Sequence, residues 1–247
     1  LKEYYPTDFI TSDRGILFLW QARMIFSGME FTGQPPFKDV YIHATVLTKD
    51  GKRMSKSLGT GVNPLELIEK YGTDALRFGL ASQATGLQDL KFGEDLLIMC
   101  KKFANKFWNI ARYVISRTGD DWKEYIVDGA KPFHINDITG SFSFGGPVRT
   151  SFENITKMIE NYDFSEVAHT IYDKLWHEVA DEYIEKSKII DDNDNIELET
   201  KRNLACFLVN ILKLLHPFMP FVTEEIYTNF LPDWPGKKLL LVEDWPT

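Results

Sequence analysis

The chain has 247 residues, of which 44% are apolar and 26% charged, and a formal net charge of −8. These proportions are ordinary for a globular protein with a sizeable core, so they exclude a disordered chain. No apolar run reaches the roughly 18 to 20 residues of a membrane helix, and the start does not resemble a signal peptide. We therefore expect a cytoplasmic protein without membrane contact. Because residue 1 is leucine, we also expect a fragment of a longer protein.

The two cysteines indicate neither a disulfide nor a metal site. Cys100 and Cys206 lie far apart in the sequence, and neither has a neighbouring residue at a metal-ligand spacing. We expect both to be buried thiols in a reducing cytosol, and we expect no protein-bound metal.

The first sixty residues have the pattern of an α/β unit. Residues 8–12 are typical of the end of a strand, residues 16–26 have helical spacing, and Gly28 is predicted to end that helix. Residues 40–47 are rich in β-branched and aromatic side chains and predict a buried strand, followed by a turn at residues 49–51.

From residue 63 onward the pattern is helical, so the fold class is mainly α. Asn63 and Pro64 have the residue types of a helix cap and first turn. The boundary between the two parts is predicted near Gly61. Residues 119–147 are rich in Gly, Pro, Asp and Ser and predict an insertion or a mobile arm. The expected helices cover residues 64–71, 73–81, 94–117, 150–161, 165–190, 198–216 and 221–230.

The segment with the clearest chemistry is residues 51–59, which read GKRMSKSLG. Two glycines bracket three cations and two hydroxyls, a composition that suits a mobile loop that binds phosphate. On composition alone, a solvated basic turn is the more frequent explanation of such a loop.

This loop resembles the K-M-S-K-S signature of the class I aminoacyl-tRNA synthetases, and other segments extend the resemblance to the valyl-tRNA synthetases in particular. Residues 18–24 (FLWQARM) resemble the F-x-W-x-A-R-M stretch of those enzymes. Isoleucyl and leucyl enzymes share the architecture without this stretch. The further matching segments are residues 36–40, 42–43, 63–65, 71–78 (YGTDALRF), 88–89, 103–109 (FANKFWN) and 216–225 (HPFMPFVTEE).

The resemblance implies both the fold and the reaction. Residues 1–62 would be the C-terminal remnant of a Rossmann-like catalytic domain, and residues 63–247 a helical anticodon-binding domain. The whole enzyme would activate valine with ATP and Mg²⁺ and transfer it to tRNA(Val), acting as a monomer. The H-I-G-H signature of such enzymes is not in this sequence, so we expect the chain to be inactive alone.

The resemblance also implies roles for individual residues in activation. Lys56 would stabilise the departing pyrophosphate, and Arg53 replaces the usual first lysine of the signature. Ser55 and Ser57 would act in closure of the loop around ATP, and His43 would lie near the adenosine.

Three residues would belong to the valine pocket. Ile16 and Trp20 fall where the family builds it, although core packing is the alternative for Trp20. Asp13 stands two places before the family's usual acidic residue, in a D-R-G run where the family has Gly-aromatic-Asp. It could reach the same ligand from a shifted loop, or the role could be lost.

A candidate tRNA-binding face lies on the helix at residues 94–117. Residues 91–117 carry six cations and two anions, in contrast to the acidic chain as a whole. Cations can contact phosphates and an aromatic ring can stack on an unpaired base, while an ordinary solvated helix face is the alternative. The residues of this face recur at the helical spacing i, i+4, i+7, i+11 and i+15. They are Lys102, Lys106, Asn109, Tyr113 and Arg117.

Two functions from different classes remain open on the sequence. The first is a segment of a valine-tRNA ligase, or of a related isoleucyl or leucyl enzyme. The second is a non-catalytic helical module of synthetase ancestry that binds RNA or another partner. An upstream reading frame with H-I-G-H and an editing insertion would favour the first.

Overall fold

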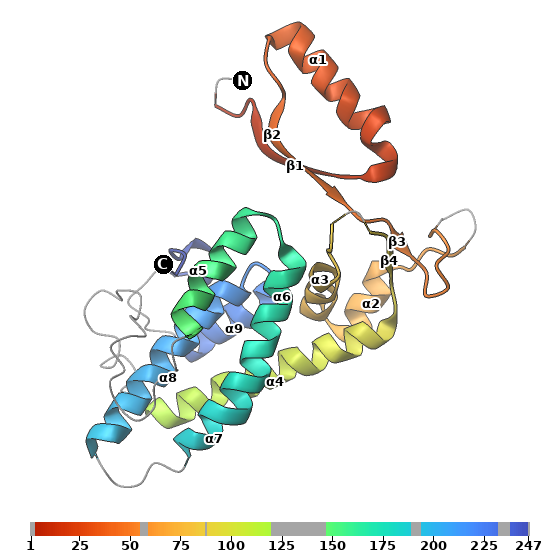
Figure 1. Cartoon of the computed structure of the whole chain (residues 1–247). Helices are drawn as coiled ribbons and strands as arrows, with labels where there is room; N and C mark the ends of the chain where they lie inside the picture. The colour runs from red at the N-terminus through yellow and green to blue at the C-terminus, as the bar shows by residue number, and fades with distance from the viewer. Residues whose placement is uncertain are drawn as a thin grey trace.

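The computed structural model describes residues 3–54, 59–86, 88–119, 147–188, 194–231 and 238–246. An N-terminal unit projects from a larger helical part, and the short strands β3 and β4 lie at the junction (Figure 1). The segment predicted to be an insertion or mobile arm falls almost entirely outside the described residues.

The N-terminal unit is a pair of parallel strands with a crossover helix. β1 (Thr7–Asp13) pairs with β2 (Phe37–His43), and α1 (Ala22–Thr32) connects them. A parallel pair needs a connection of this kind, since a hairpin turn cannot return the chain to the same end of the sheet. Between β1 and α1 the chain makes a 3-10 turn at Arg14–Ile16 and a π-helical turn at Leu17–Gln21.

The prediction that Gly28 ends the first helix is wrong. α1 continues through Gly28 to Thr32 and ends at Gly33, which has the positive φ of 73° common at helix ends. A Cβ on Gly28 would lie 2.8 Å from the hydroxyl of Tyr5 and 2.9 Å from Cδ of Pro36. Glycine therefore serves close packing at this position and does not act as a stop signal.

The predicted strand at residues 40–47 is two strands, and most of it is not buried. β2 ends at His43, and β3 (Val46–Leu47) follows after a break. In β2 only Phe37 is buried, while Lys38, Asp39 and Val40 are exposed. Within the described residues β2 has β1 as its only strand neighbour, so its apolar composition does not lead to burial here.

β3 pairs in parallel with β4 (Leu90–Lys91), which follows the first two helices of the helical part. The predicted domain boundary at residue 62 thus lies between two strands that pair with each other. The helices are α2 (Pro64–Tyr71), α3 (Thr73–Ser82), α4 (Glu94–Thr118), α5 (Pro147–Glu160), α6 (Phe164–Asp173), a π-helical segment (Lys174–Tyr183), α7 (Ile184–Ser187), α8 (Asp194–Leu215), α9 (Pro220–Phe230) and a 3-10 turn (Leu240–Val242).

In the helical part, the predicted helices are confirmed to within four residues at their described ends, although residues 165–190 form three consecutive helical segments instead of one, and the fold is mainly helical, as expected. Asn63 caps α2 as predicted, because its Oδ1 accepts a hydrogen bond from the N–H of Leu65 at 3.1 Å. The helices share one core in which the rings of Phe78 and Phe103 lie 4.9 Å apart.

Cys100 is buried in this core, and burial raises the pKa of its thiol to about 11. Cys206 is only partly buried, contrary to expectation, and both cysteines are free thiols.

An aromatic cluster joins the N-terminal unit to the helical part. Phe9 of β1 lies 5.0 Å from Tyr162, and Tyr41 of β2 lies 5.5 Å from Phe164, measured between ring centroids. The hydroxyl of Tyr162 also donates a hydrogen bond to Asp39 at 3.1 Å. Tyr162 lies in the turn between α5 and α6 and Phe164 begins α6, so this region is a contact between the two parts.

Candidate active-site edge and candidate RNA-binding helix

The carboxyl ends of β1 and β2 bring together two of the predicted site residues. Asp13 and His43 are the last residues of their strands and pair directly in the register of the sheet. In open parallel sheets, ligands bind at the carboxyl ends of the strands. The fold therefore places Asp13 and His43 at the edge where a ligand of this sheet is expected.

Asp13 is held by two hydrogen bonds at this edge. Its Oδ1 accepts from the N–H of Gly15 at 2.6 Å, and its Oδ2 accepts from the hydroxyl of Thr45 at 2.8 Å. The hydrogen bond from Thr45, followed by that from Gly15, lowers the pKa of Asp13. The charges of His43 and Arg53 lower this pKa by smaller amounts. The carboxylate thus caps the 3-10 turn and ties it to the segment after β2. Thr45 was not among the predicted site residues, because the pair is 32 positions apart.

Arg53 approaches the same edge from the start of the signature loop. Its backbone pairs with Leu47 in an antiparallel bridge. Its Nη2 atom lies 3.6 Å from the position that a Cβ on Gly15 would occupy. That distance is an ordinary van der Waals contact, whereas the same Cβ would lie only 2.8 Å from Oδ1 of Asp13, so the glycine leaves room for the carboxylate. Ser55, Lys56 and Ser57 lie outside the described residues, so their predicted roles stay predictions.

The predicted pocket residues lie on the turns just beyond β1. Ile16 and Trp20 are 45% and 59% exposed, so neither is packed in a core formed by the described residues. Gln21 beside them is only 1% exposed, and its Oε1 has no hydrogen-bond partner within the described part of the chain. The sequence pattern did not single out Gln21, because a polar residue inside a helical run is normally solvated.

His43 completes the edge. Its Nδ1 lies 3.0 Å from the carbonyl oxygen of Ala44, and the side chain is exposed. An exposed imidazole beside an arginine and a capped carboxylate can offer hydrogen bonds to a nucleotide. The proposed position of His43 near the adenosine of ATP stays a prediction.

The five residues of the predicted RNA-binding face of α4 have different surroundings. Lys102 and Asn109 are exposed. Lys106 forms an ion pair with Asp181 at 2.9 Å, and its Nζ lies 4.0 Å from the centroid of the Trp176 ring. The hydroxyl of Tyr113 lies 2.7 Å from Oγ of Ser187, within hydrogen-bond distance. Arg117 has a buried Nε without a partner among the described residues. Lys106 and Tyr113 therefore contact the neighbouring helical segments, while Lys102 and Asn109 face solvent.

Comparison with known proteins identifies the family. A model of class I tRNA synthetases (I, L, M and V) matches residues 1–93, and a model of the anticodon-binding domain of tRNA ligases matches residues 148–247. The chain is also 41% identical to the valine–tRNA ligase of Geobacillus stearothermophilus over 248 residues, and 38% identical to that of Staphylococcus haemolyticus over 253 residues. The chain belongs to the class I tRNA synthetases.

These relatives are much longer than the chain. The alignments cover 99% and 100% of this synthetase segment but 27% and 28% of the respective ligases. A leucyl-tRNA synthetase from Agrobacterium radiobacter K84, solved with tRNA and LeuAMS, has a TM-score of 0.74 at 16% identity over 100% of this chain and 29% of its own. A methionyl-tRNA synthetase from Mycobacterium tuberculosis has a TM-score of 0.64 at 17% identity, over 92% of this chain and 44% of its own. The two structures support the fold.

Two of the family-like motifs of this synthetase segment meet in the helical part. Asp74 of α3 accepts hydrogen bonds from the N–H groups of Phe221 and Val222, at 3.2 and 2.6 Å. Arg77 donates to the carbonyl oxygen of Pro217 at 2.9 Å. The segments YGTDALRF and HPFMPFVTEE are therefore bonded to each other, and these contacts give both a structural role.

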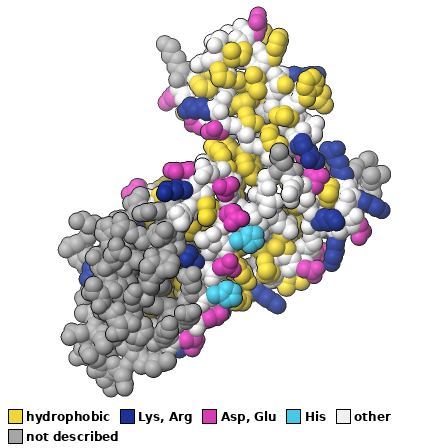
Figure 2. Space-filling view, in the orientation of Figure 1, with side chains coloured by type: hydrophobic (Ala, Val, Ile, Leu, Met, Phe, Trp, Pro, Cys, Tyr) yellow, Lys and Arg dark blue, Asp and Glu magenta, His cyan; other side chains and the backbone are white. Residues whose placement is uncertain are grey.

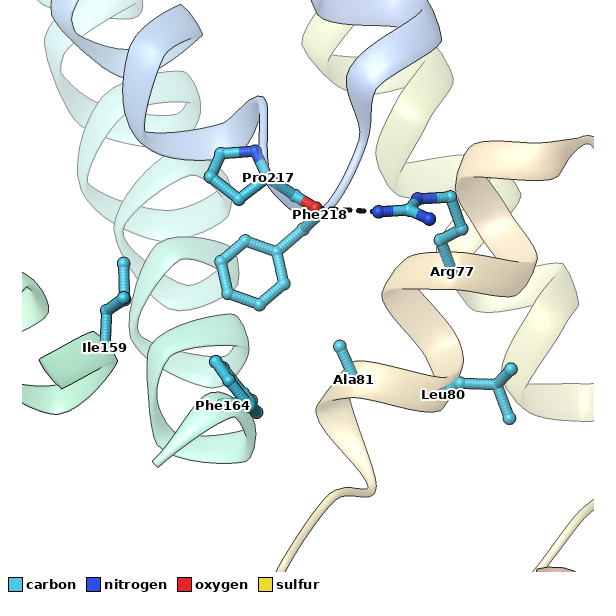
Figure 3. A pocket seen from close by; sticks show the side chains of 7 residues that line it. All are labelled: Arg77, Leu80, Ala81, Ile159, Phe164, Pro217 and Phe218. Carbon is cyan, nitrogen blue, oxygen red and sulfur yellow. Dashed lines mark hydrogen bonds between the residues drawn. The ribbon is translucent and has the colours of Figure 1, made fainter. Parts of the chain in front are cut away.

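A pocket of about 370 Å³ opens beside this contact (Figure 3). Apolar side chains from α3, the α5–α6 region and the turn before α9 surround it, and Arg77 is its only charged lining residue within the described part. None of the predicted site residues lines it. The lining residues are Arg77, Leu80, Ala81, Ile159, Phe164, Pro217 and Phe218.

Two features are absent from the described part of the synthetase segment. Across the described ranges, no group of three or more His, Cys, Asp or Glu side chains is arranged to hold a metal ion. In the same ranges, none of the helices combines the length and apolar character that crossing a bilayer requires.

Proposed function

We propose that the chain is a segment of a valine–tRNA ligase that activates valine with ATP and transfers it to tRNA(Val). The observation that carries this proposal is the identity of about 40% to valine–tRNA ligases along essentially the whole chain. The activity is proposed for the whole enzyme, which we expect to act as a cytoplasmic monomer. This segment supplies the phosphate loop and the helical tRNA-binding part.

Valine activation needs charge stabilisation at the phosphates of ATP. Valine attacks the α-phosphate, and negative charge accumulates on the departing pyrophosphate. Arg53 and Lys56 bind that charge, Ser55 and Ser57 add hydroxyl donors, and His43 contacts the adenosine side. Mg²⁺ enters with ATP and neutralises part of the triphosphate charge. The position of Arg53 beside the strand ends supports this assignment.

The amino-acid pocket is assigned to Ile16, Trp20 and Asp13. Ile16 and Trp20 present exposed apolar surface on the turns that leave β1, close to the proposed ATP edge. Asp13 supports the pocket by holding the turn, since its two oxygens bind Gly15 and Thr45. Such a pocket rejects isoleucine by size but discriminates only by about 10²-fold against threonine.

tRNA binding is assigned to α4 and its surroundings. Lys102 and Asn109 are the members of the predicted face with side chains directed to solvent, so we propose that they contact the RNA. Lys106, Tyr113 and Arg117 complete the face and support it through their contacts and burial. The match to an anticodon-binding domain model at residues 148–247 supports RNA as the partner of this part.

The decisive experiment replaces Lys56 in the whole enzyme that carries this segment. Lys56→Ala should slow adenylate formation by about 10²- to 10³-fold, on the scale for losing one donor to a developing charge. Valine binding should change little, because the charge develops only in the transition state. Stopped-flow activation kinetics separates the two effects.

The control variants are Lys56→Arg, which retains the charge, and Lys157→Ala, which removes an exposed lysine of α5. Lys56→Arg should be partly active, and Lys157→Ala should behave as the parent. An unchanged activation rate in Lys56→Ala would refute the assignment of the loop. Failure of the whole enzyme to support valine-dependent exchange between ATP and pyrophosphate would refute the proposed function itself.

A further inference from the structure

The small sheet formed by β3 and β4 has two chemically different faces. Side chains alternate between the faces of a strand, and Val46, Met54 and Leu90 pack against the helical core. Their neighbours Leu47, Arg53 and Lys91 therefore lie on the opposite face. The backbone pairing agrees, because Leu47 pairs with Lys91 on one side and with Arg53 on the other.

Lys91 is thus a second cation beside the signature loop. Two strand spacings of roughly 4.8 Å put its backbone about 10 Å from that of Arg53. Its Cε and Nζ lie 3.3 and 3.9 Å from the position of a Cβ on Gly51, the residue that begins the loop. Gly51 has a φ of 77°, so it provides both the turn and the space for the lysine stem. Lys and Arg side chains gather in this region (Figure 2).

Three carboxylates of this region are engaged with other groups. Asp89 accepts from Arg14 at 2.9 Å, and Asp95 pairs with Lys49 at 3.1 Å. Asp13 is occupied by Gly15 and Thr45. Within the described residues Lys91 forms no ion pair, and its side chain is exposed. Lys91 therefore brings to this face a positive charge that is not held in an ion pair within the described residues.

We propose that Lys91 is a further phosphate-binding residue, which acts with Arg53 on the face of the β3–β4 sheet. This inference deepens the proposed function and rests on it. Its ligand is a phosphate group, because a compact ammonium and a guanidinium at this spacing can each hold one phosphate of a polyphosphate or of an RNA strand. The polyphosphate of ATP and the backbone of tRNA are the two sources of such a group.

The test measures binding by the 247-residue chain of two probes, inorganic tripolyphosphate and a tRNA(Val) transcript. Isothermal titration calorimetry is used for the first and fluorescence anisotropy at several salt concentrations for the second. Lys91→Ala should weaken binding of at least one probe by about three- to tenfold, on the scale of one typical net hydrogen bond. If RNA is the ligand, the slope of log affinity against log salt concentration should also decrease by about one, which corresponds to one lost phosphate contact.

Lys91→Arg should restore most of the affinity, and Lys157→Ala is the matched control for loss of one positive charge. If Lys91→Ala loses affinity only for tripolyphosphate, the site belongs to the nucleotide. If it loses affinity only for the tRNA, the site belongs to the RNA. Unchanged binding of both probes by Lys91→Ala, with circular dichroism as in the parent, overturns the inference and leaves the proposed function standing. If the parent binds neither probe, the inference falls as well, while the activity assay on the whole enzyme still decides the proposed function.

Discussion

At the scale of single residues, two lysines of α4 show how the same residue type takes different roles. Lys102 and Lys106 are four positions apart and were both predicted to contact tRNA phosphates. Lys106 is held against the π-helical segment by Asp181 and the ring of Trp176. Lys102 is exposed and has no ion pair within the described residues. Only Lys102 is therefore available to a phosphate without first breaking a contact.

This difference gives a paired prediction for the chain. Lys102→Ala should lower the salt dependence of tRNA binding by about one phosphate contact and leave stability unchanged. Lys106→Ala should lower the free energy of unfolding by about 0.5 to 1 kcal/mol through the lost contact with the Trp176 ring. Urea denaturation and anisotropy titrations with tRNA(Val) check both parts.

The opposite result, a stable Lys106→Ala variant with a reduced salt dependence, would make Lys106 the phosphate ligand. The sequence could not separate the two lysines, because the partners of Lys106 lie 70 and 75 positions away. Helical spacing identifies which residues share a face. It does not identify which of them a neighbouring helix covers.

At the scale of elements, the start of α9 shows a cap that comes from another helix. Met219 precedes α9 and provides no side-chain cap. Asp74 of α3 supplies it instead, since its carboxylate binds the first N–H groups of α9 across 147 positions of sequence. The unsatisfied donors of a helix start favour such a carboxylate. Burial outweighs these bonds, however, and raises the pKa of Asp74.

Asp74→Ala should destabilise the chain by about 1 to 2 kcal/mol at pH 7, as loss of a helix cap does. Asp74→Asn should cost less, because an amide oxygen can still accept one of the two bonds. Denaturant unfolding of both variants against the parent measures the difference. Equal stability of Asp74→Ala and the parent would show that α9 starts without this carboxylate.

The dependence on pH follows from the direction of the pKa. The folded chain binds the Asp74 proton more tightly than the unfolded chain does, because the folded pKa is raised. The contribution of Asp74 to stability is therefore greatest below the unfolded pKa and decreases as pH rises through the folded pKa. The parent should gain stability relative to Asp74→Asn when the pH is lowered from 7 to 4. The same unfolding experiment at both pH values checks the sign.

At the scale of the whole molecule, the turn between α5 and α6 connects the two parts of the chain. Tyr162 packs against Phe9 and donates a hydrogen bond to Asp39. It also has a φ of 62°, an uncommon conformation for a residue with a side chain. The aromatic contacts explain why a tyrosine is kept where glycine would fit the backbone better.

Tyr162→Ala should loosen the contact between the N-terminal unit and the helical part. Amide exchange in β1 and β2 should accelerate, while the core of α4 and α8 should stay protected. Tyr162→Phe keeps the ring, so the amides of β1 and β2 should exchange much more slowly in this variant than in Tyr162→Ala. Hydrogen–deuterium exchange with mass spectrometry resolves these segments. Uniform acceleration in every helix would mean that the residue stabilises the fold as a whole.

The sequence allowed prediction of most of the fold but only part of the candidate site. Helix α2 was predictable because its cap, Asn63, and its first residue, Pro64, are local signals. The exposure of β2 was not predictable, since composition does not reveal whether another element covers a strand. Asp13 and His43 were found through a family resemblance, and their direct pairing depends on the register of two strands. Thr45 and the contacts of Tyr113 have no local signal at all.

The exposed apolar side chains around α1 have a thermodynamic consequence. Phe18, Trp20, Phe26 and Phe31 are all exposed. Water next to such surface contributes a positive heat capacity, and covering it removes that contribution. A segment that packs on this surface would therefore bind with a negative heat-capacity change, and its affinity would weaken on cooling. The stability that the N-terminal unit would gain from such a segment would grow with the apolar area that the segment covers.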